Sequence, residues 1–402
     1  MLCIFWIKAF DPVNIVVAPD SFKESLSAAG VSQAIAAGIA VVTPQAKIVC
    51  LPMADGGEGT LDAVLAVTGG ERHELDVPDA LGRTRRAAWG WLPDSTAVIE
   101  MASAAGLEHI AAHERDPARA DTQGVGELIT AALDAGAKRI VLTAGGSATN
   151  DGGSGMLRAL GMQFLDVQDR PLPPGGLALK DLAKLDAHLL DERLKEIELT
   201  IATDVRNPLC GPEGASAIFG PQKGADCAMV QALDDALHQF ANVTAQTTGI
   251  DMKDHPGAGA AGGLGFAALA WLGAQMRPGV QVVAELADLE SAIATADLVF
   301  TGEGRMDAQT LQGKTPWGVM RIARQHDVPV IAIVGSLGEG YQDLYEAGLT
   351  AAFSLVNGPT DLQAAMRQAP EWLQSRATDI MRLWLSAASN SASARSWRHS
   401  SE

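Results

Sequence analysis

The sequence is poor in cysteine, in aromatic residues and in positive charge. Its four cysteines (Cys3, Cys50, Cys210 and Cys227) form no close pair, so neither a disulfide framework nor a cysteine zinc site is expected. Aromatic residues make up only 5% of the chain, whereas 42 glycines predict many tight loops. Lys and Arg number 30 against 48 Asp and Glu, a net charge of −18 that excludes nucleic acid and anionic membrane as expected partners.

Targeting and membrane signals are also lacking. The first ten residues, MLCIFWIKAF, are apolar but carry no basic region and no cleavage site, so we do not expect a signal peptide. Residues 257–276 contain no charge, but Gly and Ala dominate them and predict a buried helix rather than a membrane span. The tail from Ser386 is rich in serine and is expected to be disordered. A cytoplasmic location is therefore expected.

A chain of 402 residues with 47% apolar residues predicts two domains, each with its own core. Short apolar runs alternate with helical patterns near both ends of the chain, which indicates a parallel sheet covered on both faces. Residues 73–101 instead show short strands with turn signals, typical of antiparallel structure. The pattern predicts an α/β fold in which residues 14–75 and 281–386 form a parallel-sheet (Rossmann- or flavodoxin-like) domain. A mixed α/β domain, residues 76–280, is inserted in it, and residues 1–13 and 387–402 are extensions.

One loop follows the apolar run IVLT and reads TAGGSATNDGGSG, residues 143–155. Its glycines and small polar residues suit a bound phosphate, but it lacks the lysine that ends a P-loop. Its own residues therefore offer amides and hydroxyls but no cation, and we expect the positive charge to come from Lys23 or Lys314 in the other domain. A tight turn is the plainer interpretation. Its candidate binding residues are Gly145, Gly146, Ser147, Asn150, Asp151 and Gly152.

Four further polar loops are predicted at the carboxyl ends of strands, the edge where open parallel sheets bind ligands. In the first, APDSFKES, Lys23 and Ser25 are expected to open a helix whose amides attract an anion. Glu303 and Lys314 of TGEGRMDAQTLQGKTPWGV suit phosphate with Mg²⁺, although Ala308 stands where a Walker A motif requires glycine. The candidates in these loops are Asp20, Ser21, Lys23, Asp55, Gly56, Gly57, Glu58, Asp204, Arg206, Asn207, Glu303, Asp307, Gln309 and Lys314.

Taken in order, these motifs resemble the bacterial glycerate kinase family, type 1. The resemblance rests on APDSFKESLSA, MADGGEGT, GGSATNDGGSG, TDVRNPLCGPEGA, FGPQKGA and TGEGRMDAQTLQGKTPWGV, and it covers about residues 14–385. It implies ATP-dependent phosphorylation of D-glycerate, at the C2 hydroxyl in most bacterial members. It also implies two α/β domains with the active site in the cleft between them.

Phosphoryl transfer requires Mg²⁺, cations on the phosphates and a carboxylate that accepts the hydroxyl proton. We hypothesise that Lys23 and Lys314 bind anions, either the phosphates or the substrate carboxylate. Asp204 and Asp307 are the leading candidates for general base and Mg²⁺ ligand, in an order that the sequence leaves open. Asp55 and Glu58 are second choices for metal or hydroxyls, and Arg206 is a candidate clamp for the carboxylate.

Other readings remain open at this point. The product could be 3-phosphoglycerate, or the acceptor a related small hydroxy acid. A different class is a non-catalytic sensor of glycerate or nucleotide, although a pure binder has no need for the acids beside the lysines. A dehydrogenase is disfavoured because the first strand ends in PDSFK rather than in a dinucleotide fingerprint. The sequence does not decide between monomer and homodimer.

Overall fold

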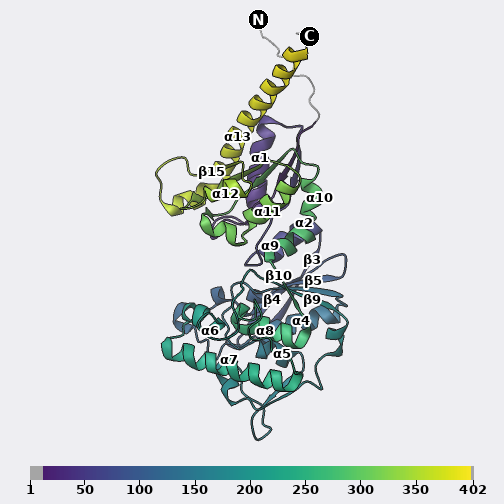
Figure 1. The fold of residues 1–402 in the computed structure, drawn as a ribbon, viewed down its shortest axis with the longest axis vertical. Coiled ribbons are helices and arrows are strands. Elements are labelled where there is room, and N and C mark those ends of the chain that lie inside the picture. The colour runs from purple at the N-terminus through teal and green to yellow at the C-terminus, as the bar shows by residue number, and fades with distance from the viewer. Residues whose placement is uncertain (1–11, 400–402) are drawn as a thin grey trace. The chain divides into compact units, whose positions relative to one another are not determined.

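The computed structural model describes residues 12–399, with side chains as far as residue 387, and divides the chain into two compact units (Figure 1). The first unit combines the residues up to Ala54 with those from Ala284 onward, and the second is Asp55–Val283. A parallel sheet lies in the first unit and a mixed sheet in the second. The α/β fold class predicted from the sequence is therefore confirmed.

The sheet of the first unit has five strands in the order β15-β13-β11-β1-β2, and every neighbouring pair is parallel. Its central strands are short β-branched runs such as NIVV and VIAIV, buried as expected for strands covered on both faces. The strands are β1 (Asn14–Val17), β2 (Lys47–Cys50), β11 (Leu298–Thr301), β13 (Val330–Val334) and β15 (Ala351–Ser354); the short strands β12 (Arg305–Met306) and β14 (Ser336–Leu337) pair with each other.

Helix α1 covers this sheet together with α13, and both contribute to its core. The Ser27 hydroxyl caps α1 by accepting from the Gly30 amide at 3.2 Å. The helices are α1 (Ala28–Val42), α10 (Leu289–Ile293), α11 (Thr315–Gln325), α12 (Asp343–Ala347) and α13 (Leu362–His399), with the 3₁₀ helix η6 (Ala308–Gln312) before α11. Helix α13 runs through the serine-rich segment 386–399 that was expected to be disordered, since no Gly or Pro interrupts it after Pro370. Residues 1–11 and 400–402 of the predicted extensions lie outside the described part.

The sheet of the second unit has the order β10-β9-β6-β5-β4-β3. The pairs from β10 to β5 are parallel, and β4 pairs antiparallel with both β5 and β3, as the turn signals in residues 73–101 predicted. The strands are β3 (Glu71–Pro78), β4 (Thr84–Trp91), β5 (Thr96–Glu100), β6 (Arg139–Thr143), β9 (Glu198–Ala202) and β10 (Gln275–Arg277), with a separate pair, β7 (Gln163–Leu165) and β8 (Lys184–Asp186).

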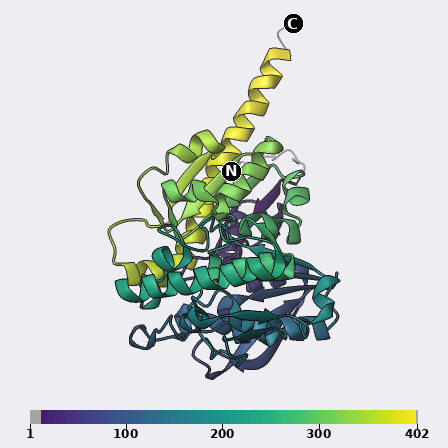
Figure 2. The ribbon, with the colours of Figure 1, turned by 60° about the horizontal axis from the view of Figure 1, so that its bottom comes forward.

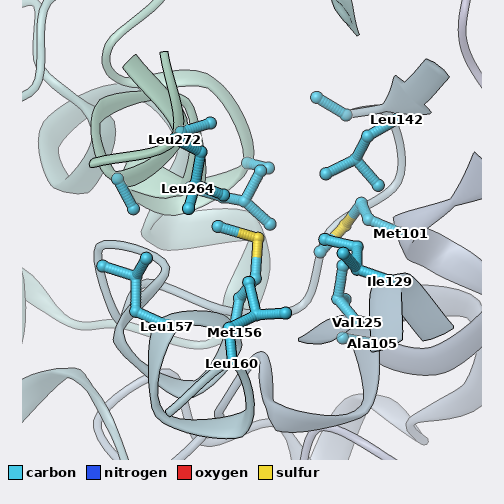
Figure 3. Close-up of a cluster of buried hydrophobic side chains, with 14 of the residues drawn as sticks. Met101, Ala105, Val125, Ile129, Leu142, Met156, Leu157, Leu160, Leu264 and Leu272 are labelled. Atoms are coloured by element: carbon cyan, nitrogen blue, oxygen red, sulfur yellow. The ribbon is translucent and has the colours of Figure 1, made fainter. Parts of the chain in front are cut away.

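The core of the second unit gathers buried side chains from its sheet and helices, and Figure 3 shows Met101, Leu142 and Leu264 within one part of it. Helix α7 is the long teal helix of Figure 2; it is capped by Asp226 and ends at Gly249 in the left-handed conformation. The helices are α2 (Thr60–Thr68), α3 (Met101–Ala105), α4 (Gln123–Asp134), α5 (Ser154–Ala159), α6 (Ala215–Phe219), α7 (Cys227–Thr248) and α8 (Ala260–Leu272), with α9 (Gly279–Leu286) at the boundary and the 3₁₀ helices η1 (Leu107–His109), η2 (Ala112–Glu114), η3 (Gly176–Asp181), η4 (Glu192–Lys195) and η5 (Pro221–Lys223).

The observed division differs from the expected one at residues 55–75. This segment was expected in the first domain, but α2 packs on β4 and β5, and β3 pairs with β4 over its whole length. A strand belongs to the unit that supplies its hydrogen-bonding partner, and β4, the partner of β3, lies within the second unit. That the two units fold independently as domains remains a prediction.

The charge-free segment 257–276 forms α8 and most of β10, and α8 is almost wholly buried. Its first turn is kinked, because Ala261, Gly262 and Gly263 all have positive φ. No helix among the described residues is long and apolar enough to span a bilayer.

Candidate active site

The polar loops singled out in the sequence follow strands at the carboxyl edge of each sheet. In the first unit they follow β1 and β11, which are adjacent and parallel. In the second unit they follow the parallel neighbours β6 and β9. Neighbouring parallel strands end at the same edge, so each unit brings its own loops together.

In the first unit, Asp20 lies three residues after the end of β1 and is held by hydrogen bonds from neighbouring residues. Its carboxylate accepts from the Ser21 amide at 2.6 Å and from the Thr315 hydroxyl at 2.5 Å. Thr315 opens α11 and is fully buried, so the bond joins two loops that are 295 residues apart in sequence. Sequence reasoning missed Thr315, although its place after Gly313-Lys314 marked it.

Glu303 is the buried acid of this unit. Its carboxylate accepts from the Thr310 hydroxyl at 2.6 Å and lies 3.5 Å from Nζ of Lys314. Burial raises the pKa of Glu303 to about 7, with a further contribution from the negative charge of Asp20, while Thr310 and Lys314 oppose the rise. Asp20, Glu303 and Lys314 are therefore close enough to interact electrostatically.

Asp307 has a different environment. It caps η6 by accepting from the Gln309 amide, and the Thr310 hydroxyl accepts in return from the Asp307 amide, a capping box. Its other oxygen pairs with the Arg305 guanidinium at 3.0 Å. Partial burial would raise its pKa, but these bonds and the nearby Lys314 outweigh that effect and hold the pKa of Asp307 below its usual value.

The expectation that Lys23 and Ser25 open a helix is wrong. Residues 22–26 form a tight turn closed by a bridge between Phe22 and Leu26, and α1 begins only at Ala28. Ser27 is the residue that caps the helix, and Glu24 adopts a positive φ of 61° within the turn. Lys23 is exposed, and its side chain makes no hydrogen bond or ion pair with a described residue.

In the second unit, the segment after Ala54 lies against the ends of β6 and β9. A Cβ on Gly56 would lie 3.0 Å from the carbonyl oxygen of Ala202, and one on Gly145 would lie 2.7 Å from Cα of Gly57. Backbone therefore touches backbone where these loops meet. This contact brings the predicted residues Asp55, Gly56, Gly57, Gly145 and Asp204 together.

Asp204, two residues after β9, is an exposed residue whose carboxyl group is still partly desolvated. This desolvation and the adjacent charge of Asp55 raise the pKa of Asp204 to about 7, with the Gly279 amide opposing the rise. No Lys or Arg within residues 12–387 forms an ion pair with it. Asp55 accepts from the Gly57 amide at 3.1 Å.

Glu100 is an acid that sequence reasoning missed. It ends β5, next to β6, and accepts from the Leu61 amide in the first turn of α2 at 2.8 Å. Burial raises the pKa of Glu100 to about 7, and the charges of Asp62 and Glu58 add to the rise. The only sequence signal for it was an acid at the end of an otherwise apolar strand.

The glycine-rich loop 143–155 is largely buried. The Asp151 carboxylate accepts from the amide and hydroxyl of Thr122 and from the amides of Gly153 and Gly155. Asn150 donates to the Ser216 hydroxyl at 2.9 Å, and both side chains are fully buried. Asp151 therefore joins the loop to the start of α4 and α5.

The sequence predicted that no cation of the same unit lies beside the loop 143–155, and the structure corrects this expectation. Lys223, from the FGPQKGA motif, is 1% exposed and donates to Oγ of Ser147 at 2.8 Å and to the carbonyl of Thr149 at 2.6 Å. The charge does not have to come from Lys23 or Lys314, because the same unit supplies it. The motif was recognised in the sequence, but 76 residues separate Lys223 from Ser147, and no local pattern joins them.

The remaining candidates lie on the surface of their loops. Arg206 is exposed and makes no ion pair with a described residue, and Asn207 donates to the Glu213 carbonyl at 2.8 Å. Glu58 and Gln309 are exposed as well. Arg206 is thus available to a ligand, whereas Asn207 braces the turn that follows.

No group of three or more His, Cys, Asp or Glu side chains in the described part is arranged to hold a metal ion. Carboxylate pairs are nevertheless the donors that Mg²⁺ prefers, and it completes its shell with water and phosphate oxygens. Asp20 and Glu303 fit that chemistry as two neighbouring acids. Asp307 fits it less well, because its oxygens already face Arg305 and the Gln309 amide.

Comparison with known proteins agrees over almost the whole chain. The model of the glycerate kinase family matches residues 15–385. A glycerate kinase of Bacillus subtilis is 48% identical over 369 residues, 92% of this chain and 97% of the relative, and a glycerate 2-kinase of Escherichia coli is 46% identical over 358 residues, 89% and 94%. A crystal structure from Salmonella typhimurium LT2, of a protein assigned as glycerate kinase 2, superposes with a TM-score of 0.86 at 44% identity, covering 94% of this chain and all of that one. The chain therefore belongs to the glycerate kinase family and is a phosphotransferase that acts on an alcohol group.

Proposed function

We propose that this enzyme transfers the γ-phosphoryl group of ATP to the C2 hydroxyl of D-glycerate, giving 2-phosphoglycerate and ADP. The similarity to a relative named glycerate 2-kinase supports the position of transfer. Asp204 carries the chemical argument: it is a carboxylate at a strand end, beside a second acid, with no cation paired to it in the described part and a pKa raised to about 7. That is the environment of a general base that works near neutral pH.

The first unit is proposed to act on the nucleotide. Lys314 lies at the start of α11, where an ammonium and free helix amides together attract phosphate oxygens. The paired acid Glu303 and the capping residue Asp307 hold Lys314 in place, at 3.5 and 4.0 Å from its Nζ. Lys23, exposed on the turn after β1, is proposed as a further cation for the phosphates.

Mg²⁺ neutralises charge on the phosphates when it is bound. Asp20 and Glu303 would hold it, since a bound cation would offset the burial and the repulsion from Asp20 that raise the pKa of Glu303. Thr315 orients Asp20 through its hydroxyl, and Thr310 orients Glu303. This assignment replaces Asp307 as a proposed metal ligand and gives Asp307 the role of fixing Lys314.

The second unit is proposed to act on glycerate. Asp204 accepts the proton of the attacking hydroxyl, and partial burial together with the charge of Asp55 raises the pKa of Asp204 to about 7. The loop 143–155 offers small polar groups to the carboxylate of the substrate. Arg206 is exposed, carries a planar guanidinium and suits that carboxylate as a bidentate partner.

The test is to incubate the purified chain with D-glycerate, ATP and Mg²⁺ and to record the phosphorus NMR spectrum of the product. ADP release is measured in parallel with and without glycerate. We expect glycerate-dependent ADP and the resonance of 2-phosphoglycerate. The resonance of 3-phosphoglycerate would refute transfer to the C2 hydroxyl. ADP release that glycerate does not stimulate would refute glycerate as the acceptor. L-Glycerate, glycolate and lactate serve as matched acceptors that lack the correct configuration or one hydroxyl.

A further inference from the structure

Lys223 is buried to a degree that is unusual for lysine. It ends η5, is 1% exposed, and its ammonium meets two atoms of the loop 143–155, Oγ of Ser147 and the carbonyl oxygen of Thr149. Removing an ammonium from water is costly unless hydrogen bonds and an opposite charge compensate. Burial lowers the pKa of Lys223 to about 7, and the negative charge of Asp151, four residues after Ser147, opposes that shift and favours the ammonium.

The direction of these hydrogen bonds constrains Ser147. An ammonium can only donate, so the Ser147 oxygen accepts, and the hydroxyl proton of Ser147 must point toward a different acceptor. No described residue accepts from that hydroxyl. Ser147 is 8% exposed, and the hydrogen bond between its hydroxyl and Lys223 is buried.

The same loop has further polar atoms that the protein does not use. Thr149 Oγ1 and Asn150 Oδ1 are buried and have no hydrogen-bond partner among the described residues. A packed loop normally satisfies nearly all such atoms. The loop around Lys223 is therefore shaped by requirements other than its own hydrogen bonding.

We propose that Lys223 is a positioning residue: it fixes the Ser147 hydroxyl as a donor to an anionic oxygen of the substrate, a carboxylate or phosphate oxygen. The positive charge behind the hydroxyl strengthens that donation and favours an anion in front of it. Lys223 also holds the Thr149 carbonyl, which fixes the peptide that follows. The inference rests on the proposed function and assigns to Ser147 and Lys223 the recognition of one negatively charged group.

The test compares Ser147→Ala, Lys223→Met and the double variant in the full chain, with Lys195→Met as the control, because Lys195 is an exposed lysine of the same unit. KM for D-glycerate, KM for ATP and kcat are measured separately, together with the melting temperature. Losing a charge-assisted hydrogen bond corresponds to about 10- to 100-fold weaker binding. We expect Ser147→Ala to raise one KM by about that factor, to change kcat less, and to lower the melting temperature modestly, because Lys223 loses one of its two hydrogen-bond acceptors.

Which KM rises identifies the anion: KM for glycerate indicates the carboxylate, and KM for ATP indicates a phosphate. Because Lys223 acts through Ser147, the double variant should bind no more weakly than the poorer of the two single variants. If Lys223→Met fails to fold, Ser147→Ala still decides, since it removes the donor and leaves the lysine bonded to Thr149. Unchanged KM for both substrates in Ser147→Ala overturns the inference.

Calorimetric titration with D-glycerate and with inorganic phosphate separates this inference from the proposed function. A wild-type chain that binds either probe but makes no ADP from glycerate refutes the function alone, and the affinities of the variants still test Ser147. Equal affinities of wild type and Ser147→Ala for both probes, or a wild-type chain that binds neither, overturn the inference.

Discussion

The loops after β9 and β11 each carry an aspartate that the sequence proposed for the same two roles, yet their environments are opposite. Asp307 is enclosed by donors: a capping box, an arginine and a nearby lysine keep it ionised. Asp204 has another acid beside it and no paired cation in the described part, and its pKa is raised to about 7. A motif thus identified two residues of interest, but only their neighbours distinguish a residue that organises a loop from one that can exchange a proton.

The strongest way to break this comparison is Asp204→Asn. The amide keeps the shape of the side chain but cannot accept the hydroxyl proton, so kcat should fall by about 10²-fold or more. The melting temperature should not fall, because the change removes the repulsion between Asp204 and Asp55. Steady-state kinetics and a thermal melt measure both, with the exposed Asp254→Asn as control. Turnover within a few-fold of wild type would remove Asp204 from the mechanism.

Asp151 is a third aspartate whose environment can be compared with those of Asp204 and Asp307, and it is the buried one. Asp151 is completely buried and accepts four hydrogen bonds, so Asp151→Ala leaves three backbone amides and the Thr122 hydroxyl without their acceptor. We expect the free energy of unfolding to fall by about 3 kcal/mol. Denaturant unfolding measures it, and Asp181→Ala, on an exposed site, should change it by less than about 0.5 kcal/mol. A loss that small in Asp151→Ala would show that the loop does not depend on this carboxylate.

The pH dependence of the reaction sharpens the comparison further. A general base must be deprotonated, and the pKa of Asp204 is raised to about 7, so kcat/KM for glycerate should be lost as pH falls through 7. Well below that value the loss should reach about tenfold per pH unit.

Two other acids have a pKa raised to about 7, so the assignment requires variants. Glu100→Gln and Glu303→Gln should keep the acidic limb of the profile if Asp204 is responsible, and Asp204→Glu should move it. A limb that disappears in Glu303→Gln would transfer the proton-accepting role to the first unit.

The smallest effect is expected for Asp307→Asn. Asparagine caps helices nearly as well as aspartate, so η6 and the position of Lys314 should be largely kept. We expect kcat within about threefold of wild type and a modest rise in KM for ATP, since the weak contact between Lys314 and Asp307 is lost. A fall of kcat by about 10²-fold would instead make Asp307 the base and reverse the comparison.

Much of the fold could be predicted because its signals are local. Apolar runs such as NIVV and VIAIV mark buried strands. The boundary at Ala54 could not be found this way, because it falls inside the MADGGEGT motif, where no linker signal marks it.

The candidate site divides in the same manner. Asp20, Glu303 and Asp204 could be selected as polar residues at strand ends, where ligands bind. The contacts of Lys223 and Thr315 could not be predicted, since their partners lie 76 and 295 residues away. The pKa of Glu100 is raised mainly by burial, and the spacing of residues in the sequence does not show how deeply a side chain is buried.

The contact between glycines bears on how this enzyme could be re-engineered. A methyl group on Gly145 would lie 2.7 Å from the backbone of Gly57, and one on Gly262 would lie 2.0 Å from the carbonyl of Thr149. Where main chain packs on main chain, every side chain larger than hydrogen forces the loops apart. Libraries designed to admit bulkier acceptor acids should therefore keep these glycines. They should vary exposed positions such as Arg206, where a change of side chain does not move the backbone.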